Sequence, residues 1–142
     1  MVVVAPVSGE VETVMRSCPP PWQGTSYVPG FASSTLTETR TAESLNRGKW
    51  VFQTYCLVCH GENGQGNGPV SVAGGGPFPG VPSLVDPTRP KMTDGAIYGM
   101  IVEAQRMGRG LMPRYGDKVH GTDRWDLVNY VRNLQLNARA GQ

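Results

Sequence analysis

The stretch Cys56-Leu57-Val58-Cys59-His60 has the spacing C-x-x-C-H. Two thiols at i and i+3 near the end of a helix can each add across one vinyl group of a haem, which gives two thioether bonds. The histidine that follows then lies under the iron and can supply an imidazole nitrogen as the proximal ligand. The motif therefore predicts one covalently bound haem c, with Cys56 and Cys59 as its thioether residues and His60 as its first axial ligand.

Other uses of this motif fit the sequence less well. A dithiol redox site of the thioredoxin type needs a β-α-β setting, and no such pattern surrounds the cysteines. A zinc site needs a second Cys/His pair at ligand spacing, whereas Cys18 and His120 are isolated and far apart. The glycine-rich stretch 61–69 is similar to a phosphate loop but lacks its Lys-Ser/Thr ending. Its glycines instead let the backbone pass close to a flat ligand.

The second axial ligand is predicted among four methionines of the second half of the chain, Met92, Met100, Met107 and Met112. A methionine opposite the histidine raises the reduction potential of a haem and suits electron transfer. Met112 is followed by a proline, which fixes the local backbone, so Met112 is the predicted ligand and Met107 is the reserve. Met100 lies among core-like helical residues and is interpreted as a core side chain. His120, which would give two histidine ligands, is interpreted as a solvated turn residue.

Three helices are predicted from apolar periodicity and capping signals. The first runs from Thr41–Ser44 to about Cys56, the second from Thr93 to about Gln105, and the third from Thr122 to about Leu136. About 30 residues rich in glycine and proline separate the first two helices, and a loop of that length is acceptable when it wraps a large buried group. No alternating run of β-formers is present. The prediction is an all-α domain.

The composition and charge limit the other functions. The chain has 142 residues with 19 glycines and 12 prolines, and its net charge of +2 is too small to indicate nucleic-acid binding. No stretch approaches the ~18 to 20 consecutive apolar residues of a membrane span. The first six residues do not have the pattern of a signal peptide. Residues 1–44 show no helical or strand period and are predicted to be an extended arm, followed by a domain over residues 45–142.

The chain resembles class I cytochromes c over roughly residues 45–136. In that family a glycine and an aromatic residue precede the first cysteine by eight and four positions, as Gly48 and Phe52 do here. The resemblance implies that both pack against Tyr130 of the last helix, with Leu127 beside it. It also implies the fold: three main helices, with long Gly/Pro loops wrapped around one haem c.

The same resemblance implies a backbone carbonyl that accepts a hydrogen bond from the proximal histidine. The family takes this carbonyl from a proline in a loop shortly before a leucine. Pro82, in Val81-Pro82-Ser83-Leu84, is the matching position, and Pro69 and Pro77 are the alternatives. Such a partner would fix the tautomer of His60 and tune the iron.

A narrower resemblance covers the second half of the chain. The stretches DGAIY at 94–98, MPRY at 112–115 and DRWDLVNYVRNLQ at 123–135 look like the mono-haem cytochrome c subunit of alternative complex III, a bacterial membrane quinol oxidoreductase. Similar motifs occur in cytochrome domains attached to haem-copper oxidases. The resemblance implies a periplasmic, membrane-associated electron-transfer subunit. Its partners would be other subunits with haem or iron-sulfur donors, and a soluble electron acceptor or terminal oxidase.

Membrane association would be indirect or through a lipid anchor, because many such subunits carry a lipidated cysteine. Cys18 is the only candidate, although no lipobox or apolar segment precedes it, and a free or disulfide-bonded thiol is the alternative. A basic rim that steers an acidic partner is predicted from Arg89, Lys91, Arg106, Arg109, Arg114 and Lys118. Arg89 and Trp125 are candidates to contact the haem propionates.

Three functions follow. The favoured one is an electron-transfer subunit that is not an enzyme by itself and has no catalytic residues. The second is a freely diffusing or oxidase-associated mono-haem cytochrome c. The third is a haem-based ligand sensor or enzyme with an open iron site, which requires Met112 to be absent from the iron.

Overall fold

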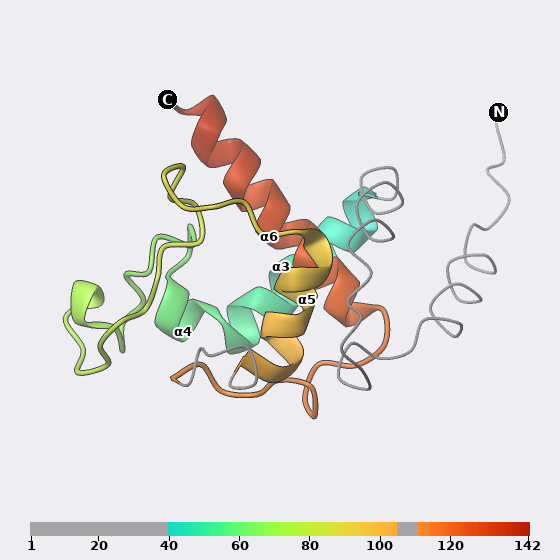
Figure 1. Ribbon diagram of the computed structural model, residues 1–142. Helices are drawn as coiled ribbons and strands as arrows, with labels where there is room; N and C mark the ends of the chain where they lie inside the picture. Colours follow the sequence, from blue (N-terminus) through green and yellow to red (C-terminus); the bar gives the residue numbers. More distant parts are fainter. Residues whose placement is uncertain (1–39, 105–110) are drawn as a thin grey trace, which may run out of the picture.

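The computed structural model describes residues 40–104 and 111–142 (Figure 1). Its elements are α3 (Ala42–Tyr55), α4 (Leu57–His60), the 3-10 turn η1 (Val72–Gly74), α5 (Asp94–Glu103) and α6 (Asp123–Ala140). The described residues form no strand, and Ser71 and Phe78 make an isolated β-bridge. The predicted all-α class I cytochrome c fold is confirmed. Cys18, Met107 and almost all of the predicted arm lie outside the described residues.

The helix starts follow the capping signals in two of three cases. The hydroxyls of Thr41 and Thr93 each accept a hydrogen bond of 3.1 Å from the backbone N–H three residues on. Thr41 is therefore the cap, and α3 begins at Ala42, three residues before the predicted start of the domain. Thr122 makes no capping bond.

Helix α6 continues to Ala140, four residues past the predicted end at Leu136. Its last turns carry no apolar period, but they contain alanine and arginine, which favour helix without any burial. None of the described helices is long and apolar enough to cross a membrane.

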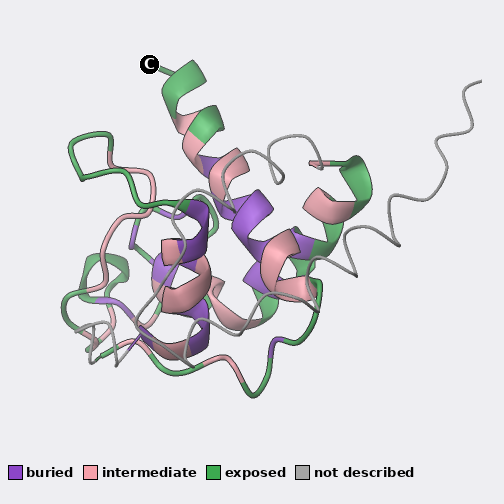
Figure 2. Cartoon of the chain, turned by 45° about the vertical axis from the view of Figure 1, so that its right-hand side comes forward, coloured by how far each residue is buried: buried purple, intermediate pink, exposed green. Residues whose placement is uncertain are grey.

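The core forms where α3 crosses α6, in the buried centre of Figure 2. A Cβ on Gly48 would lie 2.0 Å from the Asp126 carbonyl oxygen and 2.8 Å from the Tyr130 Cβ, so only glycine permits this approach. Beside it the rings of Phe52 and Tyr130 pack with centroids 5.4 Å apart, and Leu127 is fully buried. The packing that the family resemblance implies is confirmed.

A polar hydrogen-bond network links α3 and α6 at one end of their contact. The Ser44 hydroxyl donates to the Asp126 carboxylate at 2.5 Å and accepts from the buried Asn129 amide at 2.9 Å. Burial raises the pKa of Asp126, and the hydrogen bond from Ser44 opposes this shift. The network therefore satisfies polar groups that the helix crossing removes from water.

Replacing Ser44 with alanine is expected to lower the free energy of unfolding by about 1–2 kcal/mol. The change leaves the Asn129 amide without its partner and removes a donor to Asp126. Urea unfolding of the haem-loaded protein measures the effect. Gln53→Ala, at an exposed position of the same helix, is the control and should change the midpoint little. Equal midpoints for the two variants would contradict the role of the network.

Candidate haem-binding site

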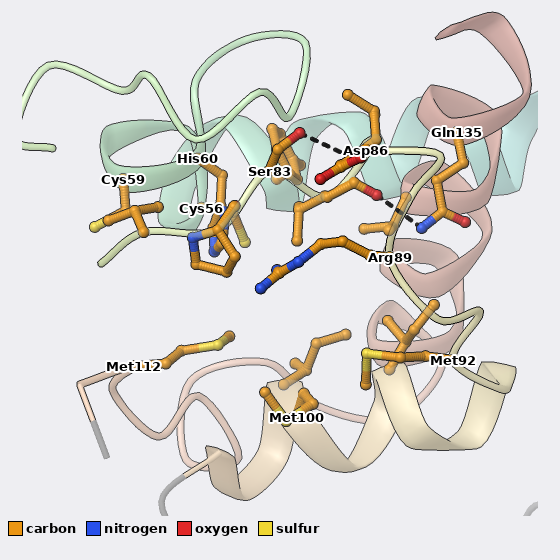
Figure 3. A pocket seen from close by; sticks show the side chains of 18 of the residues that line it. Cys56, Cys59, His60, Ser83, Asp86, Arg89, Met92, Met100, Met112 and Gln135 are labelled. Atoms are coloured by element: carbon orange, nitrogen blue, oxygen red, sulfur yellow. Dashed lines mark hydrogen bonds between the residues drawn. The ribbon is translucent and has the colours of Figure 1, made fainter. Parts of the chain in front are cut away.

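A cavity of about 580 Å³ lies between the end of α3, α4, the loop after it, α5 and α6 (Figure 3). This volume is in the range of small-molecule and cofactor pockets. Its apolar walls include Phe52, Tyr55, Ile97, Ile101, Leu127 and Val131. The three residues of the C-x-x-C-H motif, Cys56, Cys59 and His60, also line it.

The motif is held in place by a tight helical turn. Cys56 ends α3, and its carbonyl accepts hydrogen bonds from the backbone N–H of Cys59 at 3.2 Å and of His60 at 2.8 Å. Gly61 ends α4 with a φ of 78°, a conformation that favours glycine. Cys56, Cys59 and His60 therefore line one cavity from a single turn of chain.

His60 is buried, and its Nδ1 lies 3.3 Å from the Pro82 carbonyl oxygen. Burial lowers the pKa of His60, and the hydrogen bond to Pro82 opposes this in part. A neutral imidazole that donates from Nδ1 to Pro82 keeps a lone pair on Nε2, which is the arrangement a metal ligand needs. Of the three candidate prolines, Pro82 has this contact.

Three of the four candidate methionines line the cavity: Met92, Met100 and Met112. Met112 is half-buried and lies across the cavity from the Cys56–His60 turn (Figure 3). Met100, interpreted from sequence as a core side chain, is half-buried at the cavity wall. Met107 lies outside the described residues. The structure thus brings together Cys56, Cys59, His60, Pro82 and Met112.

The Cys56 thiol does not have the properties of a reactive redox cysteine. Burial, with a smaller contribution from Cys59, raises the pKa of Cys56 to about 12. Redox-active cysteines have lowered pKa values, because the thiolate is the nucleophile. Residues 40–104 and 111–142 contain no group of three or more His, Cys, Asp or Glu side chains arranged so that it could hold a metal ion by itself. The described part of the chain therefore favours neither the dithiol nor the zinc interpretation.

The walls and the rim of the cavity fit a haem. The walls are apolar where a macrocycle would lie, and Arg89 extends into the cavity from the loop above it (Figure 3). Lys91 also lines the rim. Two cations at this edge match the carboxylates that a haem carries.

The basic rim stays a prediction, and the second propionate candidate, Trp125, does not lie at the cavity. Arg114 forms ion pairs with Glu103 at 3.3 Å and Asp117 at 3.7 Å, so its charge is partly compensated. Arg106 and Arg109 lie outside the described residues. Trp125 does not line the cavity, because its ring packs on Tyr98 of α5 at 4.4 Å between centroids.

Residues 43–131 match the protein family described as "Cytochrome C oxidase, cbb3-type, subunit III". The chain belongs to this family. The matched span includes the C-x-x-C-H motif, Pro82 and Met112, and it covers more than half of the chain. A curated member, "Cbb3-type cytochrome c oxidase subunit CcoP" of Azospirillum brasilense, is 31% identical over 98 residues. The alignment covers 66% of this chain and 29% of that subunit, so the chain corresponds to under a third of the relative.

Membership in the cbb3-type subunit III family supports the cytochrome c interpretation and electron transfer as the general function. The narrower assignment to alternative complex III is not shown. The oxidase-associated alternative agrees better with both matches, because each names a cytochrome oxidase subunit.

Proposed function

We propose that this domain transfers electrons through one covalently bound haem c, in association with a membrane-bound terminal oxidase of the cbb3 type. The single observation that carries the proposal is the cavity that Cys56, Cys59 and His60 line from one side and Met112 from the other. Membership in the cbb3-type subunit III family supports the oxidase as the partner. The chain contains one C-x-x-C-H motif, which supports a single haem.

Each residue of the site has one role in this proposal. Cys56 and Cys59 would hold the ring as thioethers, and His60 and Met112 would be the ligands of the iron. The Pro82 carbonyl would fix the His60 tautomer that leaves Nε2 free to bind a metal. The bound haem supplies reversible one-electron chemistry, and His/Met ligation favours a high potential. The apolar side chains of the walls would limit the access of water to a bound haem, which would favour electron transfer over ligand chemistry.

The proposed location is the periplasmic side of the bacterial inner membrane, because haem c is attached outside the cytoplasm. The domain would be held there by other subunits or by a lipid on Cys18. Donors would be neighbouring haem or iron-sulfur centres.

Assembly with alternative complex III is the second candidate. The stretches at 94–98, 112–115 and 123–135, which resemble its mono-haem subunit, favour it. A ligand sensor is disfavoured because Met112 lies at the cavity wall opposite His60.

Covalent haem attachment is tested with the full chain, made in cells that attach haem c in the periplasm. The wild-type chain is expected to keep its haem after denaturation, and intact mass should show one haem. The double variant Cys56→Ser/Cys59→Ser should lose all haem under denaturing conditions. Cys18→Ser is the matched control and should keep it. Haem retained by the double variant, or absent from the wild type, would contradict the proposal.

The partner is tested with the reduced haem-loaded protein. Membranes that contain a cbb3-type oxidase are expected to oxidise it with consumption of oxygen, whereas membranes that lack this oxidase should not. Reduction of the oxidised haem-loaded protein by alternative complex III with quinol, without turnover of the reduced protein by the oxidase, would instead favour the second candidate.

A further inference from the structure

Two of the three arginines on helix α6, Arg124 and Arg132, hydrogen-bond to the two chain segments that contribute Met112 and Pro82 to the cavity. The two residues are eight positions apart, about 12 Å along a helix axis at 1.5 Å per residue. Both are half-buried and donate to backbone carbonyls of loops on either side of the cavity. A guanidinium can hold several acceptors at once, because its five donors form a rigid fork.

Arg124 holds the chain that follows Met112. It donates to the carbonyls of Gly116 at 2.8 Å and Val119 at 2.7 Å, and to the hydroxyl of Tyr98 at 3.1 Å. Its guanidinium also lies over the Tyr98 ring, 5.8 Å from the centroid. Residues 111–119, here called the Met112 segment, are thus tied to α6 and, through Tyr98, to α5.

Tyr115 adds two further ties within the Met112 segment. Its backbone N–H donates to the Ile101 carbonyl at 3.0 Å, and its hydroxyl donates to the Tyr55 carbonyl at 3.2 Å. The Tyr115 and Tyr55 rings also pack with centroids 5.8 Å apart. Met112 therefore lies three residues before a point that is fixed to both α5 and α3.

Arg132 holds the opposite wall. It donates to the Asp94 carboxylate at 2.5 Å, to the Met92 carbonyl, and to the Gln135 side chain at 2.8 Å. Gln135 in turn donates to the Leu84 carbonyl at 2.9 Å (Figure 3). Residues 82–92, here called the Pro82 segment, are thus tied to α6 near both ends.

The Pro82 segment leads directly to the proximal side of the site. Leu84 follows Pro82 by two residues, and its backbone N–H donates to the Gly64 carbonyl at 2.7 Å. The Pro82 carbonyl is the partner of His60 at 3.3 Å. A displacement of Leu84 would therefore change the hydrogen bond that orients the His60 ring.

We infer that Arg124 and Arg132 are positioning residues that set the two axial ligands independently. Arg124 holds Met112 at its side of the cavity, and Arg132, with Gln135, holds the Pro82 carbonyl against His60. The inference rests on the proposed axial roles of His60 and Met112. It adds that α6 fixes the spacing of the two walls before the haem contributes any bond, which pre-organises the site.

The test compares Arg124→Gln and Arg132→Gln in the ferric and reduced haem-loaded full chain. In Arg124→Gln, added imidazole is expected to replace Met112 on the haem iron about tenfold faster than in the wild type. The reason is that the variant loses hydrogen bonds from a charged group that hold the Met112 segment. It should leave the NMR shift of the His60 ring N–H unchanged. Arg132→Gln should move that resonance and change the displacement rate by less than about twofold, because the anchors are distant and independent.

Three further variants keep the comparison decisive. Arg47→Gln is the matched control, because Arg47 pairs with Asp123 on the outer face and contacts neither segment. Tyr98→Phe removes one hydrogen bond of Arg124, and Gln135→Met removes the hydrogen bonds of Gln135 with Arg132 and with the Leu84 carbonyl. Both should give weaker effects of the same selectivity if an arginine variant does not fold.

The inference is supported if Arg124→Gln changes only the displacement rate of Met112 and Arg132→Gln changes chiefly the NMR shift of the His60 ring N–H. It is overturned if both variants change the rate and the shift alike, or if both behave as Arg47→Gln does; the proposed function then still stands. A wild-type chain that has covalent haem but no spectral sign of Met–iron ligation removes Met112 as ligand and the inference with it. A wild-type chain without covalent haem refutes the proposed function itself.

Discussion

Replacing Gly48 with alanine is expected to destabilise the domain by about 3 kcal/mol or more, at or above the upper end of the usual cost of overpacking. The new Cβ would lie 2.0 Å from the Asp126 carbonyl oxygen and 2.6 Å from its carbonyl carbon. These atoms belong to the backbone of α6, so no side-chain rotation relieves the clash. The two helices must separate, which also pulls apart the Phe52 and Tyr130 rings.

The separation should reach the site, because Phe52 and Leu127 line the haem cavity. The expected result is a large fall in the urea midpoint and a low yield of haem-loaded protein. Gly141→Ala is the matched control, because Gly141 has a φ of −84° and a Cβ there would make only ordinary contacts from 3.6 Å. A midpoint for Gly48→Ala equal to that of Gly141→Ala would show that the helix crossing adapts.

The parts of the fold that the sequence predicts well are those with short-range signals. The C-x-x-C-H motif lies within five residues, and the helices follow from local periodicity and from caps at Thr41 and Thr93. The positions of Gly48 and Phe52 are fixed by their distance from Cys56. For such features, the spacing of residues along the chain is enough to predict their relative positions in the structure.

The hydrogen bonds that hold the cavity walls to α6 could not be predicted from local spacing. Arg132 and Gln135 contact residues that are 38 to 51 positions away, and no period along the sequence links the two ends. The family resemblance indicates Pro82 for the carbonyl at His60, but spacing alone does not exclude Pro69 and Pro77, because the path of the chain decides which carbonyl reaches His60. Trp125 is a candidate for the haem propionates from the sequence but packs on Tyr98, because an aromatic residue on an amphipathic helix serves either role.

Replacing Met112 with alanine is expected to have the largest effect on the proposed function. The variant should lose the near-infrared absorption of Met–iron ligation, and its reduced form should bind carbon monoxide. Its reduction potential should fall on the order of 0.1 V, a fraction of the span of about 0.8 V over which axial ligands set haem potentials. Thioether attachment should be unaffected, because Cys56 and Cys59 lie on the opposite side of the cavity.

Met100→Leu is the matched control, since Met100 lines the same cavity from α5 and leucine has nearly its volume. Spectroelectrochemical titration of the three proteins should give similar potentials for the wild type and Met100→Leu. If Met112→Ala keeps the near-infrared band and the potential, another residue binds the iron, and Met107→Ala is the next variant to measure. The wild type itself also serves as a test: a lack of the near-infrared band together with ready binding of carbon monoxide would favour the ligand sensor with an open iron site over the electron-transfer subunit. An iron that exchanges ligands suits sensing better than electron transfer.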